Sequence, residues 1–408
     1  MRVRVTLGLL GLSLLGTTTV PRAQAPASQT PRALLMVVAK QQPGMALYNA
    51  ETDQLHCKSA NLGVAPHEGA FSPDGRIAIV PTYGSSSVGA PGTDEHTVHF
   101  IRTSDCQTVA TLDTGEYTRP HFVQVGKSGT VYVTAENKEA ILVIDPATRQ
   151  ITGTIPTGSN TTHFAAISAD ETKMITSNVM GRTMSVLDVP GRKLVKQIPT
   201  ETNNQRMAIS PDQKWFATNL GQERKTAFYR LSDGELDFAV DIDGGPFTAQ
   251  FSADSRYLYV MGSAGGGGGA RGGRGGRAGG APGAPGTAPA ANPAPAAPAA
   301  APAQPAVSPA PAGQQAAPAA PGRGGRGGPQ VSLRMWKIDT QTRSVVATIS
   351  EGLGSGAGSL AVNPINGRVY ISAMANDQVT AIDPATWTIV KTIAAEDNPD
   401  GLAFTLVK

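Results

Sequence analysis

A short strand-and-turn unit recurs along this chain at a fixed spacing, and this repeat constrains the possible folds more than any other feature. The clearest copies lie at 69–75, 164–170, 207–212 and 249–254, and each contains a Ser-x-Asp turn. The last apolar residues of the seven copies can be aligned as anchors, namely Phe71, Val125, Ile167, Ile209, Phe251, Val362 and Phe404. The spacings between these anchors are 54, 42, 42, 42, 111 and 42 residues. The chain therefore contains seven units of 42 residues and two insertions.

Each unit has the pattern of four short strands. Apolar and polar residues alternate with a period of two, and β-branched residues are frequent, as in 131–134 and 140–144. Segments such as 145–149, with Asp and Pro at the start, have the composition of hairpin turns. Four antiparallel strands per unit of about 42 residues is the period of a β-propeller blade. The sequence therefore predicts an all-β fold.

The two ends of the chain complement each other. Only 405–408 follow the seventh anchor, so that unit has a first strand and no others. Segments 34–39, 45–49 and 54–58 have the pattern of the missing second, third and fourth strands. Pairing the two ends would leave no open sheet edge. We therefore expect residues 31–408 to form a seven-bladed β-propeller that is closed by its N- and C-terminal strands.

The longer insertion, at 264–329, is rich in Gly, Ala, Pro and Arg and has no aromatic residue, Asp, Glu or Lys. This composition is typical of a disordered loop. The net charge of +3 is misleading, because eight arginines lie in 1–25 and 264–329 and the rest of the chain is acidic. The propeller itself therefore lacks the basic footprint of a nucleic-acid-binding protein.

The N-terminus has the features of an export signal. Arg2 and Arg4 precede an apolar stretch at 5–15, and Ala-Gln-Ala at 23–25 is a small-x-small cleavage site. The apolar stretch is too short to span a bilayer. We expect 1–25 to be a cleaved signal peptide, and the mature protein to be a periplasmic or secreted monomer without a transmembrane segment. Cys57 and Cys106 could pair in such a compartment or remain separate thiols, and the sequence leaves both possibilities open.

Several units resemble the YVTN family of β-propeller repeats. The resemblance is closest at 143–148 with 151–158, and at 381–386 with 389–393. The Tyr-Val-Thr-Asn that gives the family its name occurs as 132–135, with Ala135 in place of Asn. The similarity covers nearly all of 31–263 and 330–408, and it implies an exported propeller. A related group, the lactonase-like propellers, uses similar Ser-Pro-Asp-Gly turns and implies an enzymatic alternative, although fold alone does not determine function.

A candidate site lies four residues before each anchor. The residues at this position are His67, His121, His163, Gln205, Phe247, Gly358 and Asp400. The first strand of a blade lines the central channel, and its start opens on the face that carries both insertions, the shorter of which spans about 84–96. Three consecutive blades thus place a histidine at the channel mouth, where loops on a rigid scaffold commonly bind ligands. The predicted ligand site consists of His67, His121, His163, Arg119, Asn160, Gln205, Arg206 and Asp400.

Two roles for these histidines remain open besides ligand binding. They could simply hydrogen-bond the backbone of neighbouring blades. They could also form an open zinc or copper site, although their spacings of 54 and 42 residues match no local metal motif. The favoured hypothesis is an exported, non-enzymatic scaffold that binds a small molecule or part of an envelope protein, and no nucleic acid. The alternative is a lactonase-like or metal-assisted hydrolase of the cell envelope, which uses a divalent metal or a histidine base.

Overall fold

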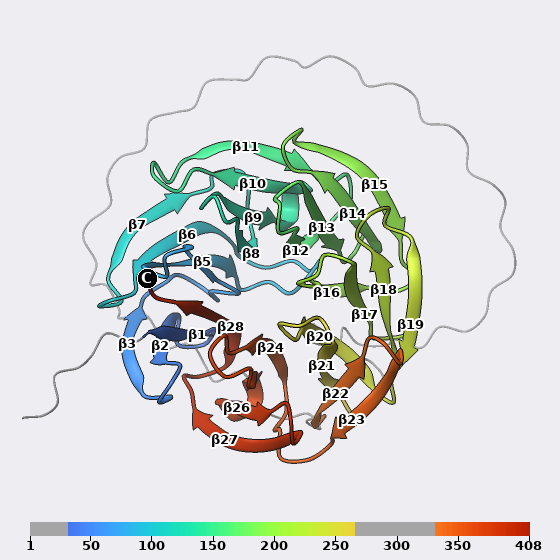
Figure 1. The fold of residues 1–408 in the computed structure, drawn as a ribbon. Helices are drawn as coiled ribbons and strands as arrows, with labels where there is room; N and C mark the ends of the chain where they lie inside the picture. Colours follow the sequence, from blue (N-terminus) through green and yellow to red (C-terminus); the bar gives the residue numbers. More distant parts are fainter. Residues whose placement is uncertain (1–31, 266–330) are drawn as a thin grey trace, which may run out of the picture.

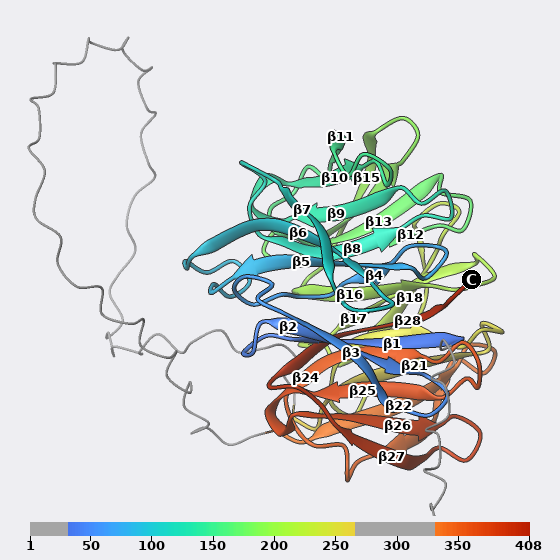
Figure 2. The ribbon, with the colours of Figure 1, turned by 90° about the vertical axis from the view of Figure 1, so that its left-hand side faces the viewer.

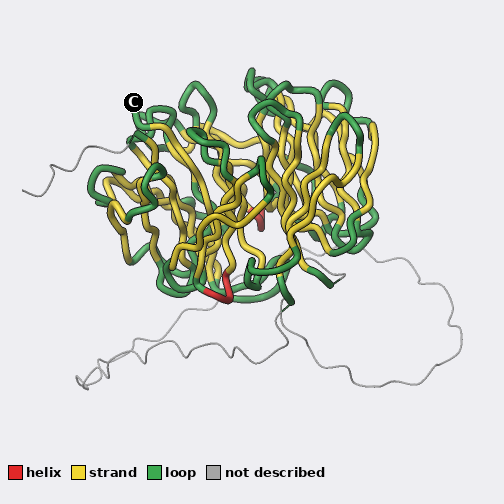
Figure 3. The backbone as a smooth tube through the Cα atoms, turned by 60° about the horizontal axis from the view of Figure 1, so that its bottom comes forward, coloured by secondary structure: helices red, strands yellow, loops and turns green. Residues whose placement is uncertain are grey.

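The computed structural model describes residues 32–265 and 331–408. Within these ranges the chain forms seven four-stranded antiparallel sheets around a central axis (Figure 1). Apart from the strands, two short 3-10 turns are present, η1 (Glu136–Lys138) and η2 (Met374–Asn376), which are red in Figure 3. The prediction of an all-β, seven-bladed propeller is therefore confirmed.

We number the blades along the chain, so that blade 1 contains β4–β7 and blade 7 contains β28 and β1–β3. The innermost strands are β4 (Ala70–Phe71), β8 (Pro120–Val125), β12 (Thr162–Ile167), β16 (Asn204–Ile209), β20 (Gly245–Phe251), β24 (Ala357–Val362) and β28 (Pro399–Leu406). The second strands are β5 (Ile77–Gly84), β9 (Val131–Ala135), β13 (Lys173–Asn178), β17 (Trp215–Leu220), β21 (Tyr257–Ser263), β25 (Val369–Ala373) and β1 (Ala33–Ala39). The third strands are β6 (Asp94–Arg102), β10 (Ala140–Ile144), β14 (Thr183–Asp188), β18 (Lys225–Arg230), β22 (Leu333–Asp339), β26 (Gln378–Asp383) and β2 (Gly44–Asn49). The outermost strands are β7 (Thr108–Asp113), β11 (Ile151–Pro156), β15 (Lys193–Pro199), β19 (Leu236–Asp241), β23 (Ser344–Ile349), β27 (Thr388–Ala394) and β3 (Leu55–Ala60).

The ring is closed by strands from the two ends of the chain. β28 pairs with β1 in an antiparallel register that places Leu35 opposite Phe404 and Met36 opposite Ala403. The two strands lie side by side in both the axial and the side view (Figure 1 and Figure 2). The predicted pairing of the N- and C-terminal strands is therefore confirmed.

The hydrophobic core lies between adjacent blades. For example, Met36 and Leu47 of blade 7 belong to the same buried cluster as Val80 and Ile101 of blade 1. Second strands such as β9 are buried along their whole length, whereas outermost strands such as β15 alternate between exposed and half-buried residues. The period-two pattern in the sequence thus reflects sheets that pack face to face around the ring.

A disulfide bond joins the first and last blades. Cys57 in β3 of blade 7 is bonded to Cys106, in the turn between β6 and β7 of blade 1, with Cα atoms 5.7 Å apart. The structure thus decides between the two possibilities that the sequence left open. The bond ties the blade that contains both chain ends to its neighbour.

The long insertion falls within blade 5. β21 and β22 pair in continuous register as far as Ser263 and Leu333, so the insertion connects a second strand to a third strand, as predicted. The proposed signal peptide at 1–25 and nearly all of the predicted disordered segment at 264–329 lie outside the described residues. In the part of the chain that the structure describes, no helix is long and apolar enough to cross a membrane.

Candidate functional site

The three histidines of the predicted site lie together in blades 1, 2 and 3. The ring centroids of His67 and His121 are 4.5 Å apart, and those of His121 and His163 are 3.6 Å apart. Tyr83 of β5 packs beside His67, with ring centroids 4.6 Å apart. All three imidazoles are buried, with at most 6% of each residue exposed. These side chains therefore stack, as expected from their equivalent positions in three consecutive blades.

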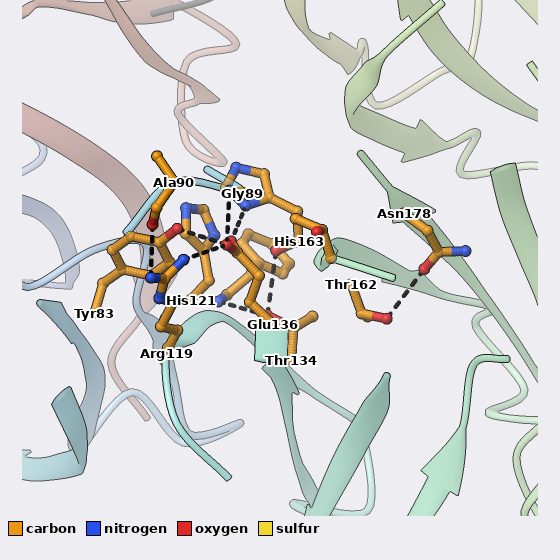
Figure 4. Close-up of polar contacts among 12 residues, drawn as sticks. Tyr83, Gly89, Ala90, Arg119, His121, Thr134, Glu136, Thr162, His163 and Asn178 are labelled. Atoms are coloured by element: carbon orange, nitrogen blue, oxygen red, sulfur yellow. Dashed lines mark hydrogen bonds and ion pairs between the residues drawn. The ribbon is translucent and has the colours of Figure 1, made fainter. Parts of the chain in front are cut away.

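Glu136 connects this stack to its surroundings (Figure 4). It lies in η1, directly after the buried strand β9, and is 1% exposed. Its Oε2 accepts a hydrogen bond from Nδ1 of His163 at 2.9 Å, and its Oε1 accepts one from the hydroxyl of Tyr83 at 2.7 Å. Burial opposes ionisation of Glu136, but the hydrogen bond and positive charge from His163, with the bond from Tyr83, outweigh it and lower the pKa of the carboxyl.

Arg119 attaches the shorter insertion to this cluster. Its Nε donates to Oδ1 of Asp94 at 2.6 Å, its Nη2 donates to the carbonyl of Ala90 at 2.7 Å, and its Nη1 lies 3.4 Å from Oε1 of Glu136. Gly89 donates its backbone N–H to Glu136 and has a φ of +66°. A Cβ atom at this glycine would lie 2.5 Å from Cγ of Met180 in blade 3. The loop between β5 and β6 therefore covers the histidine stack and requires glycine where it meets blade 3.

A second group of charges crosses the channel axis. The guanidinium of Arg206 in blade 4 pairs with Glu68 of blade 1, and donates to Oγ of Ser359 in blade 6 at 2.8 Å. Arg206 also lies 3.7 Å from Asp400, which is paired with Nζ of Lys40 at 2.8 Å. We call Glu68, Arg206, Asp400 and Lys40 the charge bridge. Because side chains from opposite blades meet here, the channel is filled at this level.

Burial and neighbouring charges shift the pKa values of the groups around the charge bridge. Burial lowers the pKa of His67 and of His121 well below the usual histidine value, and nearby positive charges add to the effect. Burial likewise raises the pKa of Glu68. The pKa of Asp400 is lowered, because attraction to Lys40 and other cations outweighs the effect of its burial. The neutral forms of His67 and His121 are thus favoured next to paired charges.

Two residues of the predicted site are not part of this cluster. Asn160 is exposed in the connection between β11 and β12, where its side chain accepts a hydrogen bond from the hydroxyl of Thr161. Gln205 lies in β16, but the position of its side chain is outside what the structure describes. Conversely, the sequence did not identify Glu68, Tyr83 or Glu136. Glu136 could have been found from the sequence, because it directly follows the five residues of a buried strand, and a carboxylate at such a position needs a polar partner.

Open space in the channel lies beyond the charge bridge, toward the ends of the innermost strands. A cavity of about 380 Å³ is lined by residues from the innermost segments of all seven blades. Its deeper lining residues lie three residues before an anchor and are Glu68, Phe122, Phe164, Thr248 and Ser359. We call these five, with Arg206 and Gly401 at the same position of blades 4 and 7, the floor ring. Its outer ring, the wall ring, lies one residue before each anchor and consists of Ala70, Gln124, Ala166, Ala208, Gln250, Ala361 and Ala403. The five alanines of the wall ring leave space in the channel, whereas Phe122, Phe164 and Arg206 occupy it at the level of the floor ring.

The cavity opens on the face opposite the histidines. The starts of the innermost strands are buried, as at His121 and His163, whereas their ends are partly exposed, as at Ile167 and Phe404. We call this cavity, from the floor ring to the anchors, the well. The well thus lies along the channel, on the far side of the charge bridge from the histidines.

The metal-binding hypothesis concerns the three stacked histidines. Nδ1 of His67 is hydrogen-bonded to the carbonyl of Ala65 at 2.8 Å, and Nδ1 of His163 is bonded to Glu136. Among residues 32–265 and 331–408, no group of three or more His, Cys, Asp or Glu side chains is arranged to hold a metal ion. A metal at His67, His121 and His163 therefore stays a prediction from the sequence.

Comparison with known proteins supports the propeller. The profile of the YNCE-like β-propeller family matches residues 116–262, about a third of the chain. No curated protein matches the sequence. One similar solved structure is a functionally unknown protein from Desulfotomaculum acetoxidans, with 12% identity, a TM-score of 0.64, and 92% of this chain and 99% of the other covered.

Two further solved structures have named activities. A putative 6-phosphogluconolactonase from Bacteroides fragilis is 14% identical, with a TM-score of 0.60 and 93% of this chain and 99% of the other covered. Hydrazine synthase from Kuenenia stuttgartiensis is 15% identical, with a TM-score of 0.58 and 82% and 88% covered. Identities this low are informative about the fold alone. The chain is thus a β-propeller with seven blades, and its closer resemblance to the YVTN repeats stays a prediction.

Proposed function

We propose that this protein is an exported, non-enzymatic scaffold that binds a small molecule in the well of its central channel. The observation that carries the proposal is the cavity of about 380 Å³, to which all seven blades contribute. Ligand sites in proteins commonly have volumes of about 300–1,000 Å³ and apolar walls with a few polar groups. Five of the seven wall-ring residues are alanine, while Phe122 and Phe164 form part of the floor.

Two features support export. The residues at 1–25 have the order of a signal peptide, with basic residues, an apolar stretch and a small-x-small site. The disulfide between Cys57 and Cys106 suits an oxidising compartment, because cytosolic thiols are generally kept reduced. Both features favour a periplasmic or secreted protein.

The charge bridge favours binding over catalysis. Arg206 is 4% exposed and is held by partners from three other blades, at Glu68, Ser359 and Asp400. A substrate that used these groups would have to break pairs that are buried, and breaking a buried pair typically costs about 3–5 kcal/mol. A fixed floor of this kind is suited to holding a ligand above it.

One observation favours a lactonase-like or metal-assisted hydrolase as the second candidate. The carboxylate of Glu136 fixes Nδ1 of His163, an arrangement that orients an imidazole to act as a general base through Nε2. The loop between β5 and β6 would have to move to admit a substrate. Hydrolysis of δ-gluconolactone that is lost in His163→Asn would establish this alternative. Metal analysis of tag-free protein would show whether a bound metal takes part.

The well can be tested with N-phenyl-1-naphthylamine, an uncharged probe whose fluorescence increases in apolar surroundings. We expect saturable binding to the wild-type protein. Ala403→Leu and Ala70→Leu each place a larger side chain in the wall ring and should weaken binding at least tenfold. Ala147→Leu, in an exposed hairpin turn, is the matched control and should bind like the wild type. Absence of saturable binding, or unchanged binding by both wall-ring variants, would contradict the proposal.

A further inference from the structure

The wall ring contains two polar residues among five alanines. Gln124 belongs to blade 2 and Gln250 to blade 5, so the two strands that carry them lie nearly opposite in a ring of seven. Their neighbours Val123 and Ala249 belong to the apolar clusters between blades. Both glutamines line the cavity. Two amide groups therefore lie at opposite edges of the well.

Neither carboxamide is used by the fold. Gln124 is half-buried and Gln250 is exposed, and neither has a side-chain hydrogen bond to another described residue. Each carboxamide offers two donor hydrogens and one acceptor oxygen. The wall ring has alanine at its five other positions, so the propeller does not require a longer side chain here. The glutamines are thus available to a molecule that enters the well.

The floor of the well excludes a strong preference for either charge. Glu68 and Arg206 neutralise each other by pairing, and both are buried, with 3% and 4% exposure. A cation placed there would approach Arg206, and an anion would approach Glu68. A charged ligand would also lose its hydration without gaining an unpaired partner of opposite charge. Electrostatics therefore favour an uncharged ligand.

The floor also contains two aromatic rings. Those of Phe122 and Phe164 pack against each other, with centroids 3.6 Å apart and planes inclined by 31°, and the guanidinium of Arg206 lies 5.6 Å from the ring centroid of Phe164. Oε2 of Glu68 lies 3.4 Å from Nδ1 of His121, on the histidine side of the charge bridge. The polar groups of the floor are therefore engaged with the protein, and the wall-ring glutamines remain for a ligand.

We infer that the well takes an uncharged molecule with amide or hydroxyl groups, recognised by Gln124 and Gln250. This inference rests on the proposed function, because it specifies the ligand class of the same cavity. It assigns a binding role to Gln124 and Gln250. The propeller fold itself does not require glutamine at these positions, because five equivalent positions are alanine.

The test uses three nearly isosteric pyridines that differ in charge, namely nicotinamide (neutral), nicotinate (anion) and 3-amidinopyridine (cation). Each competes with N-phenyl-1-naphthylamine, and saturation-transfer NMR reports direct contact. We expect nicotinamide to bind at least tenfold more tightly than either charged compound. Gln124→Leu and Gln250→Leu should each weaken nicotinamide binding about fivefold or more while the naphthylamine still binds. Gln150→Leu, an exposed glutamine of blade 2 outside the channel, is the matched control.

The possible results separate the inference from the proposed function. Equal binding of the three pyridines would overturn the inference, as would wild-type nicotinamide affinity in both glutamine variants. Either result, with naphthylamine binding still sensitive to Ala403→Leu, would leave the proposed function standing. Failure of the wild-type protein to bind the naphthylamine would overturn the proposed function and the inference together.

Discussion

Nδ1 of His163 in blade 3 is hydrogen-bonded to Oε2 of Glu136 in blade 2 at 2.9 Å, and this bond joins two blades beneath a covering loop. The same carboxylate also bonds Tyr83 of blade 1. Glu136 therefore links three consecutive blades at the histidine end of the channel. Its removal should affect the stability of the fold more than the affinity of the well.

Glu136→Gln should lower the free energy of unfolding by about 2–4 kcal/mol, because Arg119 and His163 lose a buried charged partner. Urea denaturation followed by circular dichroism measures the change. Glu139→Gln, at an exposed position three residues away, is the control and should change stability by less than about 0.5 kcal/mol. Equal free energies of unfolding for Glu136→Gln and the control would show that the contacts of the Glu136 carboxylate contribute little to stability.

The protein should become less stable as the pH falls from 7.5 to 5. His67 and His121 have a lowered pKa in the folded state, so they bind fewer protons there than in the unfolded chain. Their contribution to stability is therefore complete above the unfolded pKa of about 6.5, and is lost progressively below it. Glu68, with its raised pKa, acts in the opposite sense. The two histidines should dominate, so the free energy of unfolding should increase with pH over this range.

Thermal unfolding across this pH range provides the measurement. The groups around His121 include His67, His163, Glu68 and Arg206, so its titration reports on the whole cluster. The double variant His67→Gln, His121→Gln should have a flatter profile than the wild type. If the melting temperature of the wild-type protein does not change between pH 7.5 and 5, the predicted loss of stability from His67 and His121 is wrong.

Reduction of the disulfide should destabilise the ring. Cys57 and Cys106 are separated by 49 residues, and a cross-link over a loop of that size typically contributes about 2–4 kcal/mol. Dithiothreitol should therefore lower the melting temperature of the wild-type protein. The double variant Cys57→Ser, Cys106→Ser should already melt at the lower temperature and should not respond to the reductant. A response in that variant would point to an effect unrelated to the bond.

Replacement of 266–330 by a short Gly-Ser linker should leave the melting temperature nearly unchanged. The ends of β21 and β22 are already adjacent, since Ala264 donates its N–H to the carbonyl of Ser332 at 3.0 Å. The cost of closing a loop changes only slowly with its length. A shift of more than a few degrees in calorimetry would indicate that the segment stabilises the propeller.

The fold could be predicted from the sequence because most blades are formed by about 42 consecutive residues, and the repeat shows where each of them begins. The anchor spacing assigned every innermost strand and predicted the partners of β28 and β1. It also placed His67, His121 and His163 at equivalent positions. The same reasoning did not identify Glu136, because its partners lie in other blades and are joined by side-chain geometry that a period does not encode.

The sequence pattern did not predict the well. Whether the channel is filled at a given level depends on how far a side chain such as Arg206 reaches across the axis to Glu68, and a repeat does not encode this. The exposed placement of Asn160 depended on the course of the connection between β11 and β12. In contrast, the five alanines of the wall ring can be read from the aligned repeats once the structure shows that they line a cavity.

The pairing of β28 with β1 has a consequence for how the molecule is assembled. Blade 7 takes one strand from 399–406 and three from 33–60, so this blade is complete only after residues 399–406 have been synthesised. Until then the inner edge of β1 has no partner strand, and an unpaired edge can pair with another chain. The contact between β28 and β1 therefore also removes an edge at which an incomplete molecule could aggregate.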